Sequence, residues 1–433
     1  MARYRLLHEA NAVQPAEARA DGPSSRRGTG RSRGAGAPAS SRAPFGVNVA
    51  GYLQSEKGVG ESARSALRAA QAAGLPHVAN NVLDTTGADN VHPHTWTAEN
   101  PYSINLIHVN ADQVPLIARH LGRDYFAGRH NIGYWAWELP DFPREWESSF
   151  NYYSEVWVPS RFVQDAVARH APIPVIVMPH AIDVQEILSP EAAPPLEKRR
   201  GYFRFLFMFD FMSYWQRKNP LAVIEAFRRA FRPDDRVELI VKTAHAHFAP
   251  EGLCMIEAAA RDAQITVLDR VWTRPDVLRL IASCDSLVSL HRSEGFGLSL
   301  AEAMALGKPV IATGSSGNMD FMNSNNSLPV RYHLVPLTDD YGPYMKGSRW
   351  AEPDLDHAVE LMRWVVAHRA QAQAIGRRGA RTIHRSFSPQ AVGALTKARL
   401  RRLVQQPLRP MQFVAAGEAA PATTPLPSPA VEP

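Results

Sequence analysis

One stretch of the sequence is the most informative about the fold: His291-Arg292-Ser293-Glu294-Gly295-Phe296-Gly297-Leu298-Ser299-Leu300-Ala301-Glu302. It places two carboxylates, Glu294 and Glu302, eight residues apart, with a Gly-Phe-Gly turn between them. A buried strand is predicted just before it and a helix within it. Free backbone N–H groups at a helix start bind an anionic diphosphate, and flanking carboxylates accept hydrogen bonds from sugar hydroxyls. The layout therefore favours a sugar-nucleotide site over a plain capped helix, which needs no such turn.

Alternating strand and helix patterns surround this stretch. The first series of predicted strands is Phe45–Ala50, His77–Val82, Ser103–Val109, Asn131–Trp135, Glu155–Val158 and Pro174–Met178, with helices such as Glu61–Ala73 and Ser160–Arg169 between them. The second series is Phe203–Phe209, Val237–Val241, Ile265–Leu268, Ser286–Leu290 and Pro309–Ala312, with helices at Pro220–Phe231, Gly252–Ala263, Arg274–Ser283 and Leu298–Leu306. Such alternation predicts an α/β protein with two facing, doubly wound Rossmann-like domains and a central cleft.

The same pattern sets the expected domain limits. We expect a disordered basic tail over 1–44, an N-terminal domain over 45–189 and a C-terminal domain over 190–388 that opens with a linker. Late helices are predicted at Asp354–Ala370, Ala372–Phe387 and Pro389–Val404, and the last is expected to complete the N-terminal domain. A Pro- and Ala-rich tail over 407–433 is expected to be disordered.

The net charge of +6 is concentrated at the N-terminus, because residues 1–44 hold eight Arg against three acidic residues, which gives +5. The rest of the chain is near neutral, so nucleic acid is not expected as a partner, although the tail could contact anionic lipid head groups. The tail lacks the apolar core of a secretory signal, and no segment spans a bilayer. Two distant cysteines, Cys254 and Cys284, fit a reducing compartment. We expect a cytoplasmic protein, with peripheral contact to the inner face of the membrane as an alternative.

The run from Glu294 to Ala312, EGFGLSLAEAMALGKPVIA, resembles the E-x7-E signature of the retaining glycosyltransferases of family 4, also called group 1. The resemblance extends from about Gly46 to Arg402. It implies the two-domain GT-B fold. It also implies that Glu294 lies near the donor sugar, that Glu302 contacts the ribose, and that the backbone of the intervening residues Phe296, Gly297, Leu298 and Ser299 meets the diphosphate.

A basic pair, Arg217-Lys218, precedes the first helix of the second domain. A leaving diphosphate needs positive charge, and the family uses an Arg/Lys pair here. Lys218 matches the family's Lys. The family's Arg lies several residues earlier, where this chain has Met212 or Ser213, so Arg217 is the candidate replacement. Lys242, at the end of the second strand, is a further donor-site candidate, with a solvated strand end as the alternative.

Two other loops are candidates for donor contacts. Gly58 and Gly60 lie in the loop after the first predicted strand, which resembles the Gly-rich loop that closes over donor phosphates in the family, although a plain turn is the alternative. Arg270 and Val271 lie in the loop that frames the nucleobase in relatives.

The N-terminal domain supplies candidates on the acceptor side. His108 ends the strand Ser103–Val109, and the carboxyl ends of strands carry the chemistry in this architecture. Relatives place a His near the donor sugar and acceptor, so His108 is a catalytic candidate, with a core histidine as the alternative. Trp137 and Glu138, after the next strand, are candidate acceptor contacts.

No metal or cofactor is expected. Asp354-Leu-Asp356 has a D-x-D form, but its place at a helix start indicates a cap, and no His/Cys cluster has zinc-ligand spacing. The resemblance implies that protein cations take the diphosphate charge.

The resemblance predicts a hexosyltransferase that moves sugar from a UDP- or GDP-sugar to a glycan or lipid-linked acceptor, in surface polysaccharide assembly. The alternatives are a GT-B nucleotide-sugar epimerase and a non-catalytic nucleotide-sugar-binding protein. The retained Glu294, Glu302 and Lys218 argue against the last.

Overall fold

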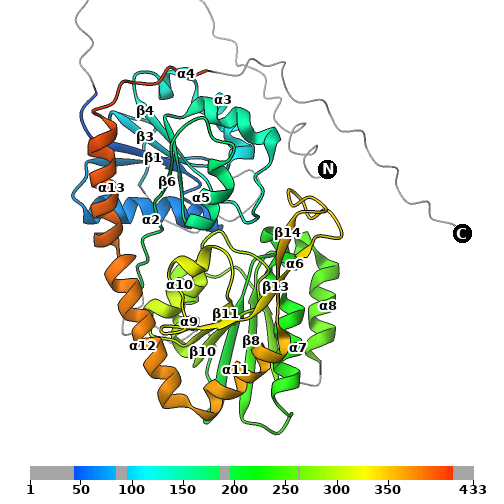
Figure 1. The fold of residues 1–433 in the computed structure, drawn as a ribbon. Coiled ribbons are helices and arrows are strands. Elements are labelled where there is room, and N and C mark those ends of the chain that lie inside the picture. The colour runs from blue at the N-terminus through cyan, green and yellow to red at the C-terminus, as the bar shows by residue number, and fades with distance from the viewer. Residues whose placement is uncertain (1–42, 84–94, 186–195, 262–263, 413–433) are drawn as a thin grey trace, which may run out of the picture.

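The computed structural model describes residues 43–83, 95–185, 196–261 and 264–412. Two α/β domains are stacked end to end in an elongated molecule (Figure 1). Nearly all of the predicted N-terminal tail, most of the predicted C-terminal tail and half of the predicted linker lie outside the described residues. None of the described helices is both long and apolar enough to cross a membrane.

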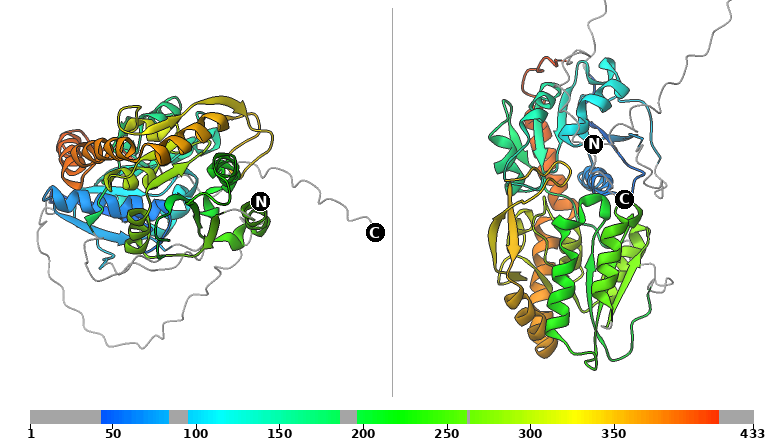
Figure 2. Two further views of the ribbon diagram at one scale, coloured as in Figure 1. Left: turned by 90° about the horizontal axis from the view of Figure 1, so that it is seen from below. Right: turned by 90° about the vertical axis from the view of Figure 1, so that its right-hand side faces the viewer.

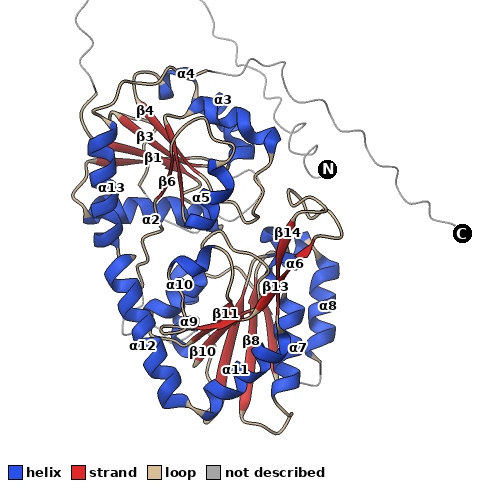
Figure 3. Cartoon of the chain, in the orientation of Figure 1, coloured by secondary structure: helices blue, strands red, loops and turns tan. Residues whose placement is uncertain are grey.

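The N-terminal domain contains a six-stranded parallel sheet of order β2-β1-β3-β4-β5-β6. Its strands are β1 (Val47–Gly51), β2 (His77–Asn81), β3 (Ile104–His108), β4 (His130–Tyr134), β5 (Glu155–Val158) and β6 (Val175–Val177). Its helices are α2 (Gly58–Ala72), α3 (Val114–Leu121), α4 (Arg123–Phe126) and α5 (Arg161–Ala168). Helix α2 lies along the face of this domain that meets the second domain (Figures 1 and 3).

The C-terminal domain repeats the design with the sheet order β12-β11-β10-β7-β8-β9. Its strands are β7 (Phe203–Met208), β8 (Val237–Thr243), β9 (Ile265–Asp269), β10 (Ser286–Ser289), β11 (Val310–Thr313) and β12 (Leu328–Val330). Its helices are α6 (Trp215–Lys218), α7 (Pro220–Ala230), α8 (Pro250–Ala260), α9 (Arg274–Ser283), α10 (Leu298–Ala305) and α11 (Leu355–Ala367). The chain order reverses between β7 and β10, and ligands of such sheets bind at that point, beyond the strand carboxyl ends.

The prediction of two doubly wound domains is confirmed, and the predicted elements recur with shifted ends. One shift affects the predicted site: α2 begins at Gly58, so Gly58 and Gly60 form its first turn rather than a loop. The backbone explains why Gly60 is needed, because a Cβ there would lie 2.4 Å from the Ser55 carbonyl oxygen. Gly58 has open space around it, so its conformation does not demand glycine.

The sequence patterns did not predict the antiparallel arm of β13 (Tyr332–Pro336) and β14 (Arg349–Pro353). The arm belongs to neither large sheet and reaches from the C-terminal domain toward the first domain (Figure 2). Leu337, Tyr344 and Trp350 from the arm are buried in the aromatic core of the N-terminal domain. The arm therefore ties the two domains together.

The last two helices also join the domains. Helix α12 (Arg369–Ser386) follows the C-terminal domain, and α13 (Pro389–Leu403) packs against α2. Between them, Ser388 caps α13 by accepting a hydrogen bond from the Ala391 N–H at 3.3 Å. The start of the predicted C-terminal tail, residues 407–412, lies against the N-terminal domain, where the Gln412 N–H donates to the Asn151 carbonyl oxygen at 3.2 Å.

The contact between α13 and α2 yields a test of stability. A Cβ at Gly393 would lie 2.4 Å from the Ala69 carbonyl oxygen, so Gly393→Ala forces the two helices apart. We expect a cost of about 1–3 kcal/mol and a lower melting temperature of the full chain. Leu395→Ala, at a half-exposed position of the same helix, is the control and should change stability by less than about 0.5 kcal/mol. Equal losses in the two variants would contradict this packing.

Candidate active site

The candidate site lies where the chain order of the second sheet reverses. Arg217 and Lys218, in the short helix α6, follow β7, and Glu294 follows β10. The Lys218 ammonium lies 2.5 Å from Glu294 Oε1, and Arg217 Nη1 lies 3.5 Å from Glu294 Oε2. The structure thus brings together three of the four predicted catalytic side chains.

Arg217 reaches the carboxylate although it lies several residues after the position of the family's Arg. Its guanidinium is 3% exposed and donates to the carbonyl oxygens of Ser293 at 2.7 Å and Ser213 at 3.2 Å. Ser213 therefore contributes a backbone acceptor at the place where the sequence lacks a cation.

Unusual backbone conformations hold this group in place. Tyr214 and Asn219, which flank α6, have φ values of 58° and 56°, and Ser316 has a φ of 70°. The Asn219 amide donates to the Leu290 carbonyl oxygen at 3.0 Å, and the Ser316 hydroxyl accepts from the Glu294 N–H at 2.9 Å. Residues with positive φ other than glycine cluster at functional sites, where the surrounding structure stabilises them.

The two cations set the charge of the carboxylate. Burial raises the pKa of Glu294, but Lys218 and Arg217 outweigh it and lower that pKa to about 2. Burial lowers the pKa of Lys218, and Glu294 opposes this shift. Near neutral pH the group consists of one carboxylate and two cations, so it carries a net positive charge that suits a diphosphate.

Helix α10 starts beside this group. Its first residue follows Gly297, which has a φ of 93°. Gly317 packs so closely on the preceding loop that a Cβ there would lie 2.1 Å from the Gly295 carbonyl oxygen. The ring of Phe296 points away into the core, with its centroid 4.9 Å from that of His180. Phe296 therefore presents mainly its backbone to a ligand, and the half-buried Leu298 and Ser299 add free backbone N–H groups at the helix start.

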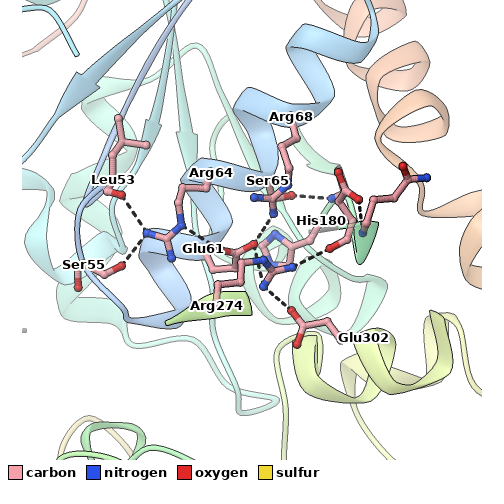
Figure 4. Close-up of polar contacts among 12 residues, drawn as sticks. Leu53, Ser55, Glu61, Arg64, Ser65, Arg68, His180, Arg274 and Glu302 are labelled. Atoms are coloured by element: carbon pink, nitrogen blue, oxygen red, sulfur yellow. Dashed lines mark hydrogen bonds and ion pairs between the residues drawn. The ribbon is translucent and has the colours of Figure 1, made fainter. Parts of the chain in front are cut away.

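Glu302 lies in a second group of charges that spans the two domains. Arg274 Nη1, from α9, donates to Glu302 Oε1 at 2.7 Å and lies 3.2 Å from Glu61 Oε1, on α2 (Figure 4). Arg64 and Arg68 also bind Glu61. The carboxylate predicted to bind ribose is thus already paired with an arginine that also contacts the N-terminal domain.

The two carboxylates of this group differ in pKa. Burial raises the pKa of Glu302 above its usual range, although Arg274 opposes the shift. Burial also favours neutral Glu61, but Arg274, Arg68 and Arg64 hold its pKa well below the usual range. Glu61 is therefore the fixed negative centre of the cluster.

The first turn of α2 faces the C-terminal domain. Glu56, just before Gly58, contributes to the electrostatic environment of Lys242 together with Asp210 and Asp269. Lys242 is 7% exposed, and burial lowers the pKa of its ammonium. Glu56 of the predicted loop is thus close enough to act on the charge of Lys242 across the domain boundary.

His108 lies on the N-terminal side of the boundary. Its Nδ1 shares a hydrogen bond of 2.9 Å with the Ser62 hydroxyl of α2, and its ring stacks on Tyr134. Burial and the neighbouring His180 hold the pKa of His108 well below its usual range, so the ring is neutral at pH 7. Among the described residues, no hydrogen bond or ion pair joins His108 to Glu294.

The remaining predicted residues are more dispersed. Trp137 is 3% exposed inside the aromatic core, and its indole N–H donates to the Asp141 carbonyl oxygen, which leaves its ring little surface for an acceptor. Glu138 instead accepts from the Tyr344 hydroxyl at 2.8 Å, close to Arg217. Arg270 is exposed and Val271 half-buried at the end of β9. Asp354 caps α11, as the sequence indicates.

The sequence patterns missed several residues of these groups, namely Glu61, Arg64, Arg68, Arg274 and Tyr344, and indicated a cleft loop over 314–318 without a role for Ser316. The spacing of Glu61, Arg64 and Arg68 places them on one face of a helix and was an available signal. Arg274 and Tyr344 reach the site through tertiary packing, for which the local sequence holds no signal.

The ion pairs of Glu294 yield a pH-dependent prediction. The unfolded carboxyl titrates near 4.5 and the folded one near 2, so its stabilising contribution is present above pH 4.5 and is lost as pH falls toward 2. Glu294→Gln leaves two buried cations without their partner, and we expect a loss of about 3–5 kcal/mol at pH 7. Chemical denaturation at several pH values should show that the difference in free energy of unfolding between Glu294→Gln and the unmodified chain becomes smaller below pH 4.5.

The matched control is Glu360→Gln, on the exposed face of α11, which should leave stability unchanged across the same pH range. The assigned ion pairs would be ruled out if the difference in free energy of unfolding between Glu294→Gln and the unmodified chain stayed constant from pH 7 to pH 3.

Comparison with known proteins bears on one segment of the sequence and on the fold. Residues 211–336 match the family model of the glycosyl transferases group 1. No curated protein sequence matches the chain. HepE from Anabaena, solved with UDP and glucose, is 14% identical with a TM-score of 0.59, and the match covers 83% of this chain and 100% of HepE.

Two other solved structures are similar over most of their length. A glycosyltransferase from Rickettsia africae is 14% identical with a TM-score of 0.60, covering 84% of this chain and 100% of that one. Sucrose-phosphate synthase from Thermosynechococcus elongatus is 14% identical with a TM-score of 0.60, and the match covers 83% of this chain and 99% of the synthase. The chain therefore has the GT-B fold, and the segment that holds Lys218, Glu294 and Glu302 matches the glycosyl transferases group 1.

Proposed function

We propose that the chain is a retaining glycosyltransferase of family 4 that moves a hexose from a UDP- or GDP-sugar to a glycan or lipid-linked acceptor. The observation that carries the proposal is the group of Glu294, Lys218 and Arg217 beside the start of α10. It lies at the carboxyl ends of β7 and β10, where such sheets bind ligands. It also lies within the segment that matches the family model.

In this proposal the diphosphate binds to the cations and to the start of α10. Lys218 and Arg217 face the developing negative charge of the leaving group, and the N–H groups of Phe296–Ser299 donate to its oxygens. Because the cations are already fixed by Glu294 and by backbone carbonyls, little reorganisation accompanies the reaction. Lys242 supplements this positive field from the end of β8.

Glu294 acts as a fixed negative charge and not as a base or nucleophile. A carboxyl with a pKa of about 2 accepts a proton weakly at neutral pH. A permanent carboxylate close to the transferred sugar stabilises the positive charge that develops at the anomeric carbon. The same negative charge keeps Lys218 in its ammonium form.

The acceptor binds to residues of the N-terminal domain. His108 is neutral, and its buried Nε2 has no hydrogen-bond partner among the described residues, so it is a candidate to contact a hydroxyl group. Glu138 adds a carboxylate near Arg217 on the same side. Closure of the two domains over the donor limits hydrolysis, which competes with transfer.

The donor class and the cellular role are also part of the proposal. HepE was solved with UDP-glucose, which makes UDP-sugars the first donors to test. The resemblance to family 4 supports assembly of a surface polysaccharide, in the cytoplasm or at the inner face of the membrane.

A donor screen by thermal shift tests the function. A ligand at 100 times its dissociation constant stabilises the native state by about 2.7 kcal/mol, so a matching UDP- or GDP-sugar should raise the melting temperature. No shift with any of these sugars would sink the proposal. Product analysis of the responding donor with and without an acceptor separates the alternatives, because an epimerase converts the donor alone and a non-catalytic binder converts nothing.

Lys218→Ala tests the catalytic assignment. Loss of one preorganised cation at the leaving group should lower kcat by about 10²–10³-fold, because that charge acts mainly in the transition state. Lys346→Ala, at an exposed position of the β13–β14 arm, is the matched control and should retain full activity. Steady-state kinetics that show equal activity in the two variants would remove Lys218 from the mechanism.

A further inference from the structure

A cavity of about 430 Å³ lies next to the second charge group and has no role in the proposed reaction. Its walls come from α2, from β2, from residues 95–97 and from Arg274 of the C-terminal domain. Its volume falls in the range of about 300–1,000 Å³ that is usual for small-molecule sites.

Arginine side chains give the cavity a positively charged wall. Arg64, Arg68 and Arg274 line it, and Arg64 and Arg274 are 3% and 9% exposed. All three pair with the single carboxylate of Glu61, and Arg274 also with Glu302. Three guanidiniums face two carboxylates, of which Glu302 has a raised pKa, so the wall carries excess positive charge.

Arg68 has donors left for a ligand. Its Nη2 pairs with Glu61, while its Nε is buried without a hydrogen-bond partner among the described residues. A guanidinium carries five N–H donors in a planar fork that matches phosphate and carboxylate oxygens. The Arg68 side chain is 16% exposed and lines the cavity, so N–H groups that Glu61 does not bind are placed to donate to an anionic group there.

An aromatic side chain forms the rim. The indole of Trp96 lines the cavity and is 44% exposed, which is unusual for so large an apolar group. The neighbouring Thr97 is fixed to the sheet, because its N–H donates to the Ala79 carbonyl oxygen at 2.9 Å and its own carbonyl accepts from Asn80 at 2.7 Å. An aromatic side chain on an anchored segment beside arginines suits a ligand with an apolar ring face and an acidic substituent.

We propose that this cavity is a second binding site, for a sugar that carries a phosphate or carboxylate group. The acidic group binds Arg68 and Arg274, and the ring lies against Trp96. Arg274 touches Glu302, the carboxylate assigned to the nucleotide end of the donor, so the bound sugar lies away from the transferred sugar.

Arg274 couples this site to the donor site, a step that rests on the proposed function. An anion in the cavity competes with Glu302 for the Arg274 guanidinium and so frees Glu302 to accept from the ribose hydroxyls. Binding at the two sites is then mutually favourable, since coupling between sites is reciprocal.

Calorimetric titration of the full chain without donor tests the site. The probes are mannose 6-phosphate, glucuronate, uncharged glucose and inorganic phosphate, so that the arms distinguish a phosphate from a carboxylate. We expect at least one acidic sugar to bind at least 10-fold more tightly than glucose and than inorganic phosphate. The proposal is overturned if neither acidic sugar binds. It is also overturned if inorganic phosphate binds as tightly as the acidic sugars, because the sugar ring then contributes nothing.

Variants locate the binding. Trp96→Ala and Arg68→Gln should each weaken binding of the acidic sugar by about 10-fold or more. Arg68→Lys keeps the charge but not the planar fork, so its affinity should lie between that of Arg68→Gln and that of the unmodified chain. Tyr332→Ala and Arg119→Gln, at exposed positions outside the cavity, are the matched controls and should bind normally. Unchanged affinity in Trp96→Ala and Arg68→Gln, with melting temperatures showing that both are folded, overturns the assignment.

A second titration, with UDP in the presence and absence of the acidic sugar, measures the coupling. We expect the sugar to tighten UDP binding severalfold in the unmodified chain and to have no effect in Arg274→Gln. The same titration with GDP covers the other proposed donor class. Sugar binding with neither UDP nor GDP binding would contradict the proposed function and the coupling, but not the second site.

Discussion

The buried contact of Glu294 with Lys218 and Arg217 is the interaction on which the candidate site depends. Two buried cations in α6, beyond the carboxyl end of β7, would repel each other and lose hydration without a carboxylate between them. Glu294, which follows the adjacent strand β10, relieves both costs, and the two cations in turn lower its pKa. The left-handed residues on either side of α6, and Ser316 behind Glu294, direct these side chains toward one another.

The two carboxylates of the Glu294–Glu302 stretch have opposite surroundings despite their short spacing. Glu294 faces two cations within its own domain, and its pKa is lowered. Glu302 faces one arginine that it shares with Glu61 of the other domain, and its pKa is raised. In the proposed function, the donor would therefore meet a permanently charged residue at its sugar end. At its nucleotide end it would meet a residue whose charge depends on Arg274.

The sequence predicted the fold and the centre of the candidate site because both are local in the chain. Alternating buried strands and amphipathic helices are regular patterns, and Glu294, Phe296–Ser299 and Glu302 lie in one continuous motif. Lys218 was found by its place just before the first helix of the second domain, where it matches the family's Lys. The role of Arg217 needed the structure, because only the fold of α6 shows that its guanidinium reaches Glu294. Arg274 and Tyr344 were missed since their partners are distant in the sequence, and Glu61 and Glu138 among them belong to the other domain.

The packing of α13 on α2 has a consequence for synthesis on the ribosome. Chains emerge N-terminus first, and domains usually fold as units in that order. Here Lys397 of α13 donates to the Ala73 carbonyl oxygen at the end of α2, and Gly393 lies directly on α2. The apolar face of α2 is thus fully covered only after α13 has been synthesised, which follows every strand of the second domain. The first domain to emerge is therefore the last to be completed, and until then part of its apolar surface stays exposed to solvent.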